Sequence, residues 1–282
     1  MRYGWISFTT DYGLDDPFVG VCHGVIAGIA HEARVIDITH GVPAGDIRQG
    51  AHALAQAVPY LPTSVHLAVV DPGVGTARRG VVIVAPEGVL VGPDNGLLTP
   101  AAEVLGGIER GFELTNSSFR LPTVSATFHG RDVFAPAAAH LASGVPPEDL
   151  GPPLSLHDLE RLPSPAPTVR DGSVITEVLC VDHFGNIQLA AAGATLADAG
   201  FAEGEPVTVR VGQARHTGVV GSTFADVQDG DLVVLADSAG LVELAINGAS
   251  AATRMGLVPG HSAQECTITA SPTATRPGRR TA

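Results

Sequence analysis

The sequence predicts an α/β protein, with an N-terminal, mostly parallel sheet covered by helices and a smaller, C-terminal antiparallel β-barrel-like domain. Three observations support this class. Apolar strand patterns alternate with helical patterns over the first 150 residues, a proline-rich stretch follows, and short strand patterns separated by Gly, Asp and Asn fill most of the remainder. Strands that alternate with helices form parallel sheets through right-handed crossovers, whereas closely spaced short strands are typical of antiparallel barrels.

The first domain is expected over residues 1–150, with a series of strands and helices in alternation. Its strands are predicted at residues 3–9, 34–38, 64–70, 81–85 and 89–91. The first helix is expected to begin at Pro17, because proline suits the first turn and the preceding acidic residues suit a helix N-terminus. Further helices are expected from about Asp46, within residues 92–105, and over residues 136–142.

The second half of the chain divides into a linker, a domain and a tail. Residues 151–172 hold many prolines, and this density is typical of a linker. Residues 173–260 are expected to form the β domain. Its strands are predicted at residues 173–181, 186–190, 206–211, 218–220, 232–235 and 241–246. The apolar pattern ends near His261, so residues 261–282 are expected to be a flexible tail.

Composition excludes several classes of protein. Hydrophobic residues make up 45% of the 282 residues and charged residues 16%, so the chain can bury a sizeable core. The formal charge of −13 argues against binding to nucleic acid, which requires a basic surface. No apolar run reaches the roughly 18 residues of a membrane span, and the N-terminus lacks a signal-peptide pattern. We therefore expect a cytoplasmic protein without membrane association.

The segment VVDPGVGTARRG, residues 69–80, is the stretch around which a site is expected. An apolar strand runs into Asp71 and is broken at once by proline and glycine, and Arg78 and Arg79 can reach back to that carboxylate. Asp11 follows the first strand in the same way, so both carboxylates are expected at one edge of a parallel sheet, where ligands bind. Two plainer interpretations stay open: an Asp-Pro-Gly turn and a capping role for Asp11.

The segment FHGRD offers His129 beside Arg131 and Asp132, although a single histidine is more often structural than catalytic. No HxH or HExxH spacing indicates a metal, and the three cysteines are far apart, so neither a metal site nor a disulfide framework is predicted. The dinucleotide fingerprint, the P-loop and the Gly-X-Ser-X-Gly elbow are missing from the sequence. Residue patterns alone therefore indicate a two-domain α/β protein with a polar cleft at its strand ends.

Several motifs in unbroken order over most of residues 5–256 carry a more specific resemblance. They are TTDYGLDDPFVG, IDITHGVPAGDIRQGA, VVDPGVGTARRG, VGPDNGLL, TFHGRDVFAPAAAHL, VDHFGN and DSAGLVELAINGASAA. Together they resemble the S-adenosylmethionine (SAM) hydrolase family, also called SAM hydroxide adenosyltransferases, which are relatives of the fluorinase and chlorinase enzymes. The resemblance implies a homotrimer, with active sites between the N-terminal domain of one subunit and the C-terminal domain of the next.

The implied reaction is attack of water on the 5′ carbon of the SAM ribose, which gives adenosine and L-methionine without a cofactor or a metal. The family's catalytic triad falls on Asp71, Arg78 and His129, and its ribose-binding carboxylate falls on Asp11. The C-terminal contacts to substrate fall on Asp182, Phe184, Asn186, Ser238, Glu243, Ile246 and Asn247.

The resemblance also suggests a division of roles within the triad. Arg78 beside Asp71 is expected to lower the carboxyl pKa, which makes Asp71 a poor base and a positioning group, and leaves His129 to take the proton from water. A halide could attack the same carbon, but halogenases carry an aromatic residue where Asp71 stands, and a fixed carboxylate repels a desolvated halide.

Two further points remain open. A non-catalytic binder of SAM or adenosine is the third alternative, and the presence of all three triad residues argues against it. Many relatives also follow Phe-Gly-Asn with Thr-Asn, whereas this chain continues Ile-Gln over residues 187–188. The C-terminal part of the expected site therefore departs from the family pattern at these two positions.

Overall fold

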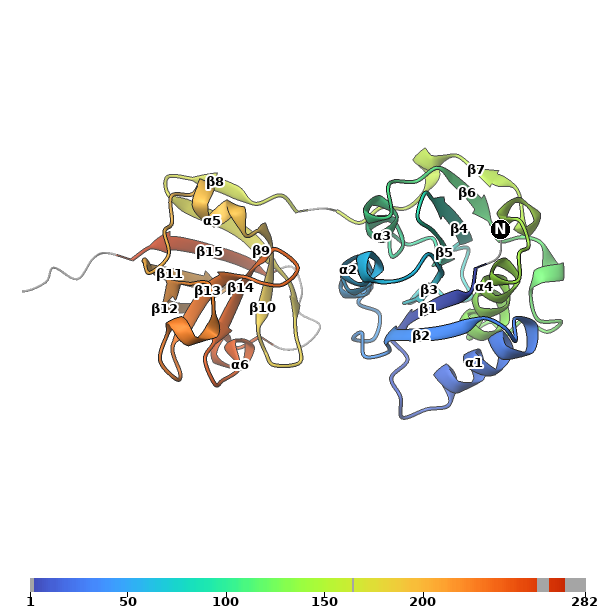
Figure 1. Ribbon diagram of the computed structural model, residues 1–282, viewed down its shortest axis with the longest axis horizontal. Coiled ribbons are helices and arrows are strands. Elements are labelled where there is room, and N and C mark those ends of the chain that lie inside the picture. Colours follow the sequence, from blue (N-terminus) through green and yellow to red (C-terminus); the bar gives the residue numbers. More distant parts are fainter. Residues whose placement is uncertain (1–2, 164, 258–263, 272–282) are drawn as a thin grey trace, which may run out of the picture. The chain divides into compact units, whose positions relative to one another are not determined.

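The computed structural model describes residues 3–163, 165–257 and 264–271. The chain forms two compact units, Met1–Pro163 and Ser164–Ala282, each with its own sheet and hydrophobic core (Figure 1). The predicted class, an α/β N-terminal part followed by a C-terminal β-barrel, is confirmed.

The N-terminal unit is built on a seven-stranded sheet of order β2-β1-β3-β5-β4-β6-β7. Its strands are β1 Trp5–Thr10, β2 Arg34–Thr39, β3 Val65–Val69, β4 Gly80–Ala85, β5 Gly88–Pro93, β6 Arg110–Glu113 and β7 Pro153–Leu154. The neighbours β2, β1, β3 and β5 are parallel, whereas β4, β6 and β7 add antiparallel pairs. The carboxyl ends of β1 and β3 therefore lie at the same edge, as the sequence predicted.

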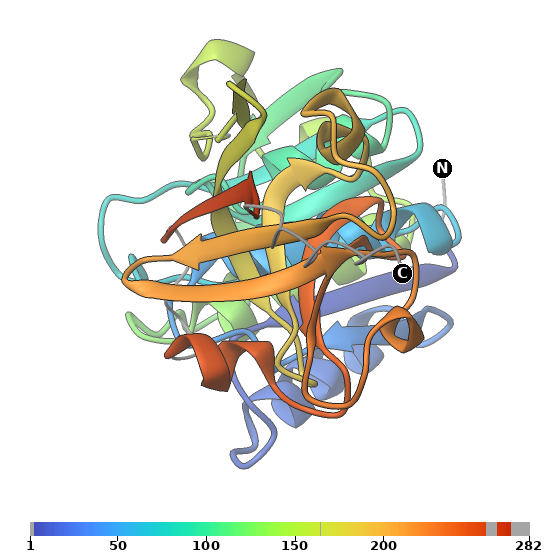
Figure 2. The ribbon, with the colours of Figure 1, turned by 90° about the vertical axis from the view of Figure 1, so that its left-hand side faces the viewer.

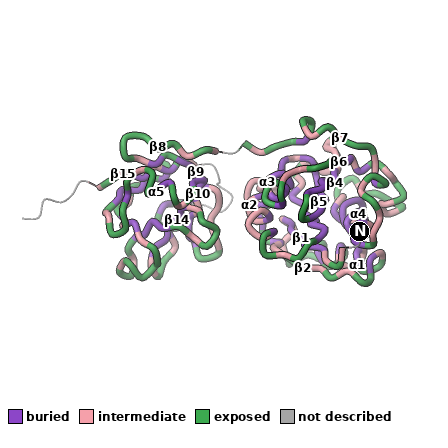
Figure 3. The backbone as a smooth tube through the Cα atoms, turned by 45° about the horizontal axis from the view of Figure 1, so that its top comes forward, coloured by how far each residue is buried: buried purple, intermediate pink, exposed green. Residues whose placement is uncertain are grey.

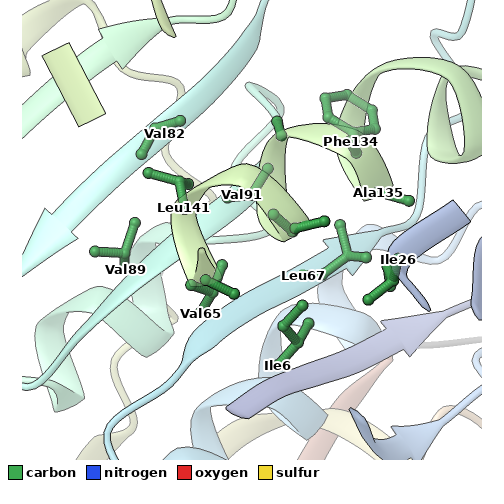
Figure 4. Close-up of a cluster of buried hydrophobic side chains, with 14 of the residues drawn as sticks. Ile6, Ile26, Val65, Leu67, Val82, Val89, Val91, Phe134, Ala135 and Leu141 are labelled. Carbon is green, nitrogen blue, oxygen red and sulfur yellow. The ribbon is translucent and has the colours of Figure 1, made fainter. Parts of the chain in front are cut away.

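Helices cover both faces of this sheet, and strand alternation gives each face its own apolar core. The helices are α1 Phe18–Ile29, α2 Ile47–Ala57, α3 Thr99–Val104 and α4 Ala135–Ala142. Ile6, Val65 and Leu67 point toward α1 and α4, and these side chains are fully buried (Figure 4). Ala68 and Leu90 lie in the second core, with α2 and α3. Asp46 caps α2 by accepting a hydrogen bond from Gln49 N at 3.0 Å, so the predicted helix start is confirmed.

The C-terminal unit is a barrel of short strands, coloured yellow to red in Figure 2. Its strands are β8 Thr168–Arg170, β9 Ser173–Val181, β10 Ile187–Ala192, β11 Pro206–Val211, β12 Ala214–Val220, β13 Leu232–Ala236, β14 Leu241–Ile246 and β15 Glu265–Ala270. Strand β9 pairs with both β10 and β15, so all strands of this eight-stranded sheet except β8 close on themselves. Closure leaves few strand edges exposed. The short helices α5 Ala194–Asp198 and α6 Ala251–Met255 complete the unit.

Two expectations about connecting segments need correction. The expected linker, residues 151–172, contains β7 and β8, and its leucines anchor it: Leu159 is 5% exposed in the core that α2 and α3 share. The expected tail, residues 261–282, contains β15, in which Cys266 and Ile268 are fully buried. In this strand Cys266 and Ile268 alternate with threonines, so one face of the strand is apolar. A barrel strand needs only one apolar face, because its other face points outward. The remainder of that tail, residues 261–263 and 272–282, lies outside the described residues.

Burial along the chain follows the same division into units. Buried segments concentrate in the central strands of each sheet and in α4, whereas loops are mainly exposed or intermediate (Figure 3). In the described part of the chain, no helix combines the length and apolar character needed to cross a bilayer.

Candidate active site

Asp71, Arg78 and His129 form one connected group in the N-terminal unit. Arg78 donates from Nε to Asp71 Oδ1 at 3.0 Å and from its terminal nitrogen to Oδ2 at 2.5 Å. The same terminal nitrogen lies 3.1 Å from His129 Nδ1. The side chains of Arg78 and Asp71 are only 10% and 6% exposed, so this is a sheltered bidentate pair. The structure thus brings together three residues that the sequence separates by up to 58 positions (129 minus 71).

A tight turn after β3 produces this arrangement. Thr76 Oγ1 donates to Gly73 O at 2.7 Å, and Val74 N donates to Asp71 O at 3.1 Å, so the chain folds back and returns Arg78 to Asp71. Gly75 has φ +77°, and a Cβ there would lie 2.4 Å from Ala126 O. Only glycine fits this close approach of two backbones. The turn therefore packs directly against the segment that leads to His129.

The direction of the pKa shift of Asp71 differs from the one expected from the sequence. Burial raises the pKa of Asp71 above its ordinary value, and the Arg78 charge offsets this only in part. The expectation of a lowered pKa was wrong because the sequence shows the charged neighbour but not the burial. Burial and the Arg78 charge lower the pKa of His129, so its imidazole is neutral at pH 7.

The contact with Arg78 also fixes the tautomer of His129. A guanidinium can only donate hydrogen bonds, so the neutral imidazole must accept at Nδ1 and carry its proton on Nε2. His129 then presents an N–H donor on its other side. This tautomer suits His129 to orient a water oxygen and not to remove a proton from it.

Asp11 follows β1 in a loop that the structure holds at several points. Asp11 Oδ2 accepts from Gly45 N at 2.9 Å, and Gly13 N donates to His40 O at 2.8 Å. The sequence also allowed a plainer role for Asp11, as the N-cap of a helix. Asp11 does not have that role, because α1 begins later, at Phe18.

Tyr12 is a candidate site residue that sequence reasoning missed. Burial raises the pKa of its phenol, and the charges of Asp11 and Asp71 add to this effect, so Tyr12 lies near both carboxylates. Its only sequence signal was its position between Asp11 and Gly13 within the first motif. Tyr12 packs edge-on against Phe18 and Phe128, which makes it a wall between α1 and the His129 segment.

Replacing Gly130 by alanine is expected to destabilise the N-terminal unit and disturb this wall. Gly130 begins a π-helical turn, Gly130–Phe134, and a Cβ there would lie 2.0 Å from the Tyr12 hydroxyl. Such overpacking costs about 1–3 kcal/mol, so thermal unfolding should begin at a lower temperature. Gly24→Ala in α1 is the control, because nothing lies within 4 Å of its added Cβ. Equal melting temperatures for the two variants would contradict the contact.

The C-terminal candidate residues all line one open cavity of about 1050 Å³ in the barrel unit. They are Asp182, Phe184, Asn186, Ser238, Glu243, Ile246 and Asn247, and Ser222, Thr223 and Phe224 join them from a loop that the sequence did not indicate. Phe184 is 77% exposed, an unusual position for a large aromatic side chain unless a ligand or a partner covers it. The two groups of candidate residues thus belong to different units.

Asp182 organises the rim of this cavity. Its Oδ1 accepts from the backbone nitrogens of Phe184 and Asn186 at 2.9 and 2.8 Å, and its Oδ2 accepts from Asn186 Nδ2 at 2.9 Å. The side-chain nitrogen of Gln188 donates to Asp237, another cavity residue. This contact forms a polar link between β10 and the cavity wall.

Glu243 is a cavity carboxylate whose pKa is strongly shifted. Burial, with the neighbouring charges of Asp182 and Asp237, raises its pKa from 4.5 to about 7. Near neutral pH a large share of Glu243 is therefore protonated and can donate a hydrogen bond to a ligand. This behaviour could not be predicted from the sequence, because it depends on burial and on the approach of Asp182, which is far from Glu243 along the chain.

The raised pKa of Glu243 predicts a pH-dependent stability. Between pH 4.5 and 7 the folded chain retains a proton that the unfolded chain has lost, so stability contributed by this group falls as pH rises through that window. Glu243→Gln removes the effect, and its free energy of unfolding relative to wild type should rise by about 2 kcal/mol across the window. Denaturant unfolding at several pH values measures this difference. A pH-independent difference would show that Glu243 ionises normally.

Comparison with known proteins gives a consistent result over most of the chain. Residues 6–151 match the family model of the SAM hydroxide adenosyltransferase N-terminal domain, and residues 176–264 match that of the C-terminal domain. A protein of Salinispora arenicola named (R)-S-adenosyl-L-methionine hydrolase is 56% identical over 256 residues, covering 91% of this chain and 95% of its own length. A protein of Thermus thermophilus with the same name is 44% identical, with 90% and 96% covered.

More distant relatives and solved structures extend the comparison. A fluorinase of an Actinoplanes species is 29% identical, with 86% of this chain and 91% of the fluorinase covered. A crystal structure described as an uncharacterized conserved protein from Thermotoga maritima has a TM-score of 0.86 and 38% identity, and the match covers 94% of this chain and 99% of that chain. The hydrolase-named proteins are thus considerably more similar to this chain than that fluorinase.

Proposed function

Since this chain belongs to the SAM hydroxide adenosyltransferase family, we propose that it hydrolyses S-adenosyl-L-methionine. Water attacks the 5′ carbon of the ribose, the carbon–sulfur bond breaks, and adenosine and L-methionine leave. The observation that carries the proposal is the sheltered contact of Asp71 with Arg78 and His129, in a chain 56% identical to a hydrolase-named relative.

The reaction requires the protein mainly to align the attacking water with the 5′ carbon and the sulfur. The sulfur of a sulfonium departs as a neutral thioether, so no general acid, metal or cofactor is needed to activate it. Holding water, the 5′ carbon and sulfur in line can lower the barrier by several kcal/mol. We assign this alignment to the Asp71 group, with Asp11 as the carboxylate that accepts hydrogen bonds from the ribose hydroxyls.

The structure favours a different division of roles from the one expected from the sequence. His129 carries its proton on Nε2 and keeps it, and this N–H donates a hydrogen bond to the attacking water oxygen, which turns the other water lone pair toward carbon. Asp71, whose pKa burial raises, receives the proton that the oxygen loses as the new bond forms. Arg78 links the two residues and keeps the carboxylate in place.

The C-terminal cavity is proposed to hold the adenosine and methionine parts of the substrate. Its polar groups, among them Asn186 and Glu243, surround a space with a large apolar share, which suits a nucleoside. We further propose a homotrimer, in which the cavity of one subunit serves the Asp71 group of another, and a cytoplasmic location. Size-exclusion chromatography with light scattering tests the trimer.

Two alternatives make different predictions. A halogenase would need to place a desolvated anion beside Asp71, which is only 6% exposed, and repulsion there is severe. A non-catalytic binder would use the cavity without the Asp71 group. Neither alternative gives a reason for the bidentate contact of Arg78 with Asp71.

Chromatography of the purified chain after incubation with SAM tests the proposal. Adenosine and methionine should form in equal amounts, and His129→Ala should abolish most of this activity. His157→Ala, at an exposed position, is the control. Unchanged SAM that remains bound would favour the binder, and 5′-chloro-5′-deoxyadenosine in the presence of chloride would favour the halogenase.

The names of the relatives specify one configuration at sulfur. We propose that this chain likewise prefers the (R) sulfonium diastereomer. Separate incubations with the resolved diastereomers test the preference, and equal rates for both would contradict it.

A further inference from the structure

We propose that His23, Asp37 and His40 form a binding site for a divalent transition-metal ion of the zinc type, separate from the Asp71 group. His23 lies on α1, Asp37 on β2, and His40 directly after β2. Their ligand atoms all lie within 4.8 Å of one another. The sequence predicted no metal because the chain spacing of these residues matches no short motif, and the fold brings them together.

The distances are close to those that a metal requires. Asp37 Oδ1 lies 2.9 Å from His23 Nε2 and 3.0 Å from His40 Nε2. Two ligands at about 2.0–2.1 Å from a tetrahedral zinc ion are about 3.3 Å apart, so small side-chain adjustments would accommodate the ion. Two imidazoles and a carboxylate are the donors that zinc and its neighbours prefer, whereas magnesium prefers oxygen alone.

The hydrogen bonds of His40 provide the strongest support. Its side chain is 3% exposed, and its Nε2 has no hydrogen-bond partner among the described residues, although Asp37 Oδ1 is 3.0 Å away. His40 Nδ1 lies 2.8 Å from Thr10 Oγ1, which also accepts from Tyr12 N at 3.1 Å. With the proton on Nδ1 and donated to Thr10, the bare Nε2 lies 3.0 Å from a carboxylate oxygen with no hydrogen bond between the two atoms, so these two electron-rich atoms repel each other. A cation between them would remove that repulsion.

The surroundings suit a site that is open on one side. The Phe8 ring packs against both imidazoles, with centroid separations of 5.9 Å to His23 and 4.9 Å to His40. The side chains of His23 and Asp37 are 34% and 44% exposed, so water can complete the coordination from outside. The three protein ligands thus hold an ion at the surface over an apolar floor.

The ion would also stabilise the loop that carries Asp11. His40 is connected to that loop twice, through Thr10 Oγ1 to Tyr12 N and through its own backbone oxygen to Gly13 N. Metal binding should therefore reduce opening of these backbone hydrogen bonds. This consequence does not depend on the reaction that the chain catalyses.

Zinc titration of the chelator-treated full-length chain against a chromogenic zinc indicator tests the site. We expect one zinc ion per chain at this site, and each of His23→Ala, Asp37→Asn and His40→Gln should weaken its binding at least about 10-fold. His31→Ala, an exposed histidine just after α1, is the matched control and should bind zinc as wild type does. His23→Ala alters a partly exposed side chain, so it decides the question even if His40→Gln fails to fold.

Hydrogen exchange provides an independent readout. Zinc should slow exchange of the Tyr12 and Gly13 amides in the wild type and in His31→Ala, but not in His23→Ala. Zinc affinity that is the same in all three ligand variants as in the control would overturn the proposal. So would zinc binding that only His129→Ala removes, because the ion would then belong to the Asp71 group.

Discussion

Arg78→Lys is expected to lower kcat at least about 100-fold while the chain remains folded. Arg78 makes two hydrogen bonds to Asp71 and a third to His129 Nδ1. A lysine keeps the positive charge, but its single ammonium group cannot reproduce the planar guanidinium, which contacts both Asp71 and His129. Loss of this link frees His129 to change tautomer and lets Asp71 rotate, so water is no longer held in line. Steady-state kinetics with SAM measures the effect.

The next residue supplies a matched control. Arg79 also pairs with a buried carboxylate, since its Nε and its terminal nitrogen both donate to Asp94 Oδ2, at 3.0 and 2.6 Å. Arg79→Lys should therefore affect stability and leave kcat within a few-fold of wild type. If both lysine variants lose activity equally, the loss comes from the fold, and the assigned role of Arg78 is wrong.

Asp71→Asn is expected to reduce kcat by a similar or larger factor, at least about 100-fold. Asparagine keeps the shape of the side chain, but it places an NH₂ group against a guanidinium that can only donate. It also removes the proposed proton acceptor, whose pKa burial raises. Because the side chain is 6% exposed, solvent cannot readily replace the lost acceptor.

Asp94→Asn is the corresponding control, since Asp94 is 3% exposed and binds Arg79. It should retain near-normal kcat. Near-normal activity of Asp71→Asn, with SAM still bound, would refute a role for this carboxylate in either positioning or proton transfer. Measuring KM beside kcat separates a binding defect from a chemical one.

Much of the fold could be predicted because local patterns agree with it. The strands at residues 173–181, 206–211 and 241–246 have the predicted bounds, since alternating apolar residues lie between clear turn residues. Strand β6, Arg110–Glu113, was missed because four residues with one arginine and one glycine give little alternation. Strand β15 was missed because it follows a long apolar-poor stretch and is stabilised by pairing with β9 and β11.

The candidate site was only partly predictable, for a different reason. Motifs identified Asp71, Arg78 and His129, and the structure places them in contact. Their pKa values depend on burial, and the tautomer of His129 depends on hydrogen-bond direction, neither of which the sequence contains, so the roles that we propose for Asp71 and His129 differ from those expected from the sequence. Tyr12 is a similar case, because its importance follows from its fit against Gly130.

The most direct test of the account is hydrolysis of SAM in water enriched in oxygen-18, with chloride present. We predict adenosine that carries one oxygen-18 atom at its 5′ position, formed in equal amount with unlabelled L-methionine, as mass spectrometry would show. That result requires a new bond between water oxygen and the 5′ carbon. Unlabelled adenosine, or 5′-chloro-5′-deoxyadenosine in its place, would contradict attack by water at this carbon.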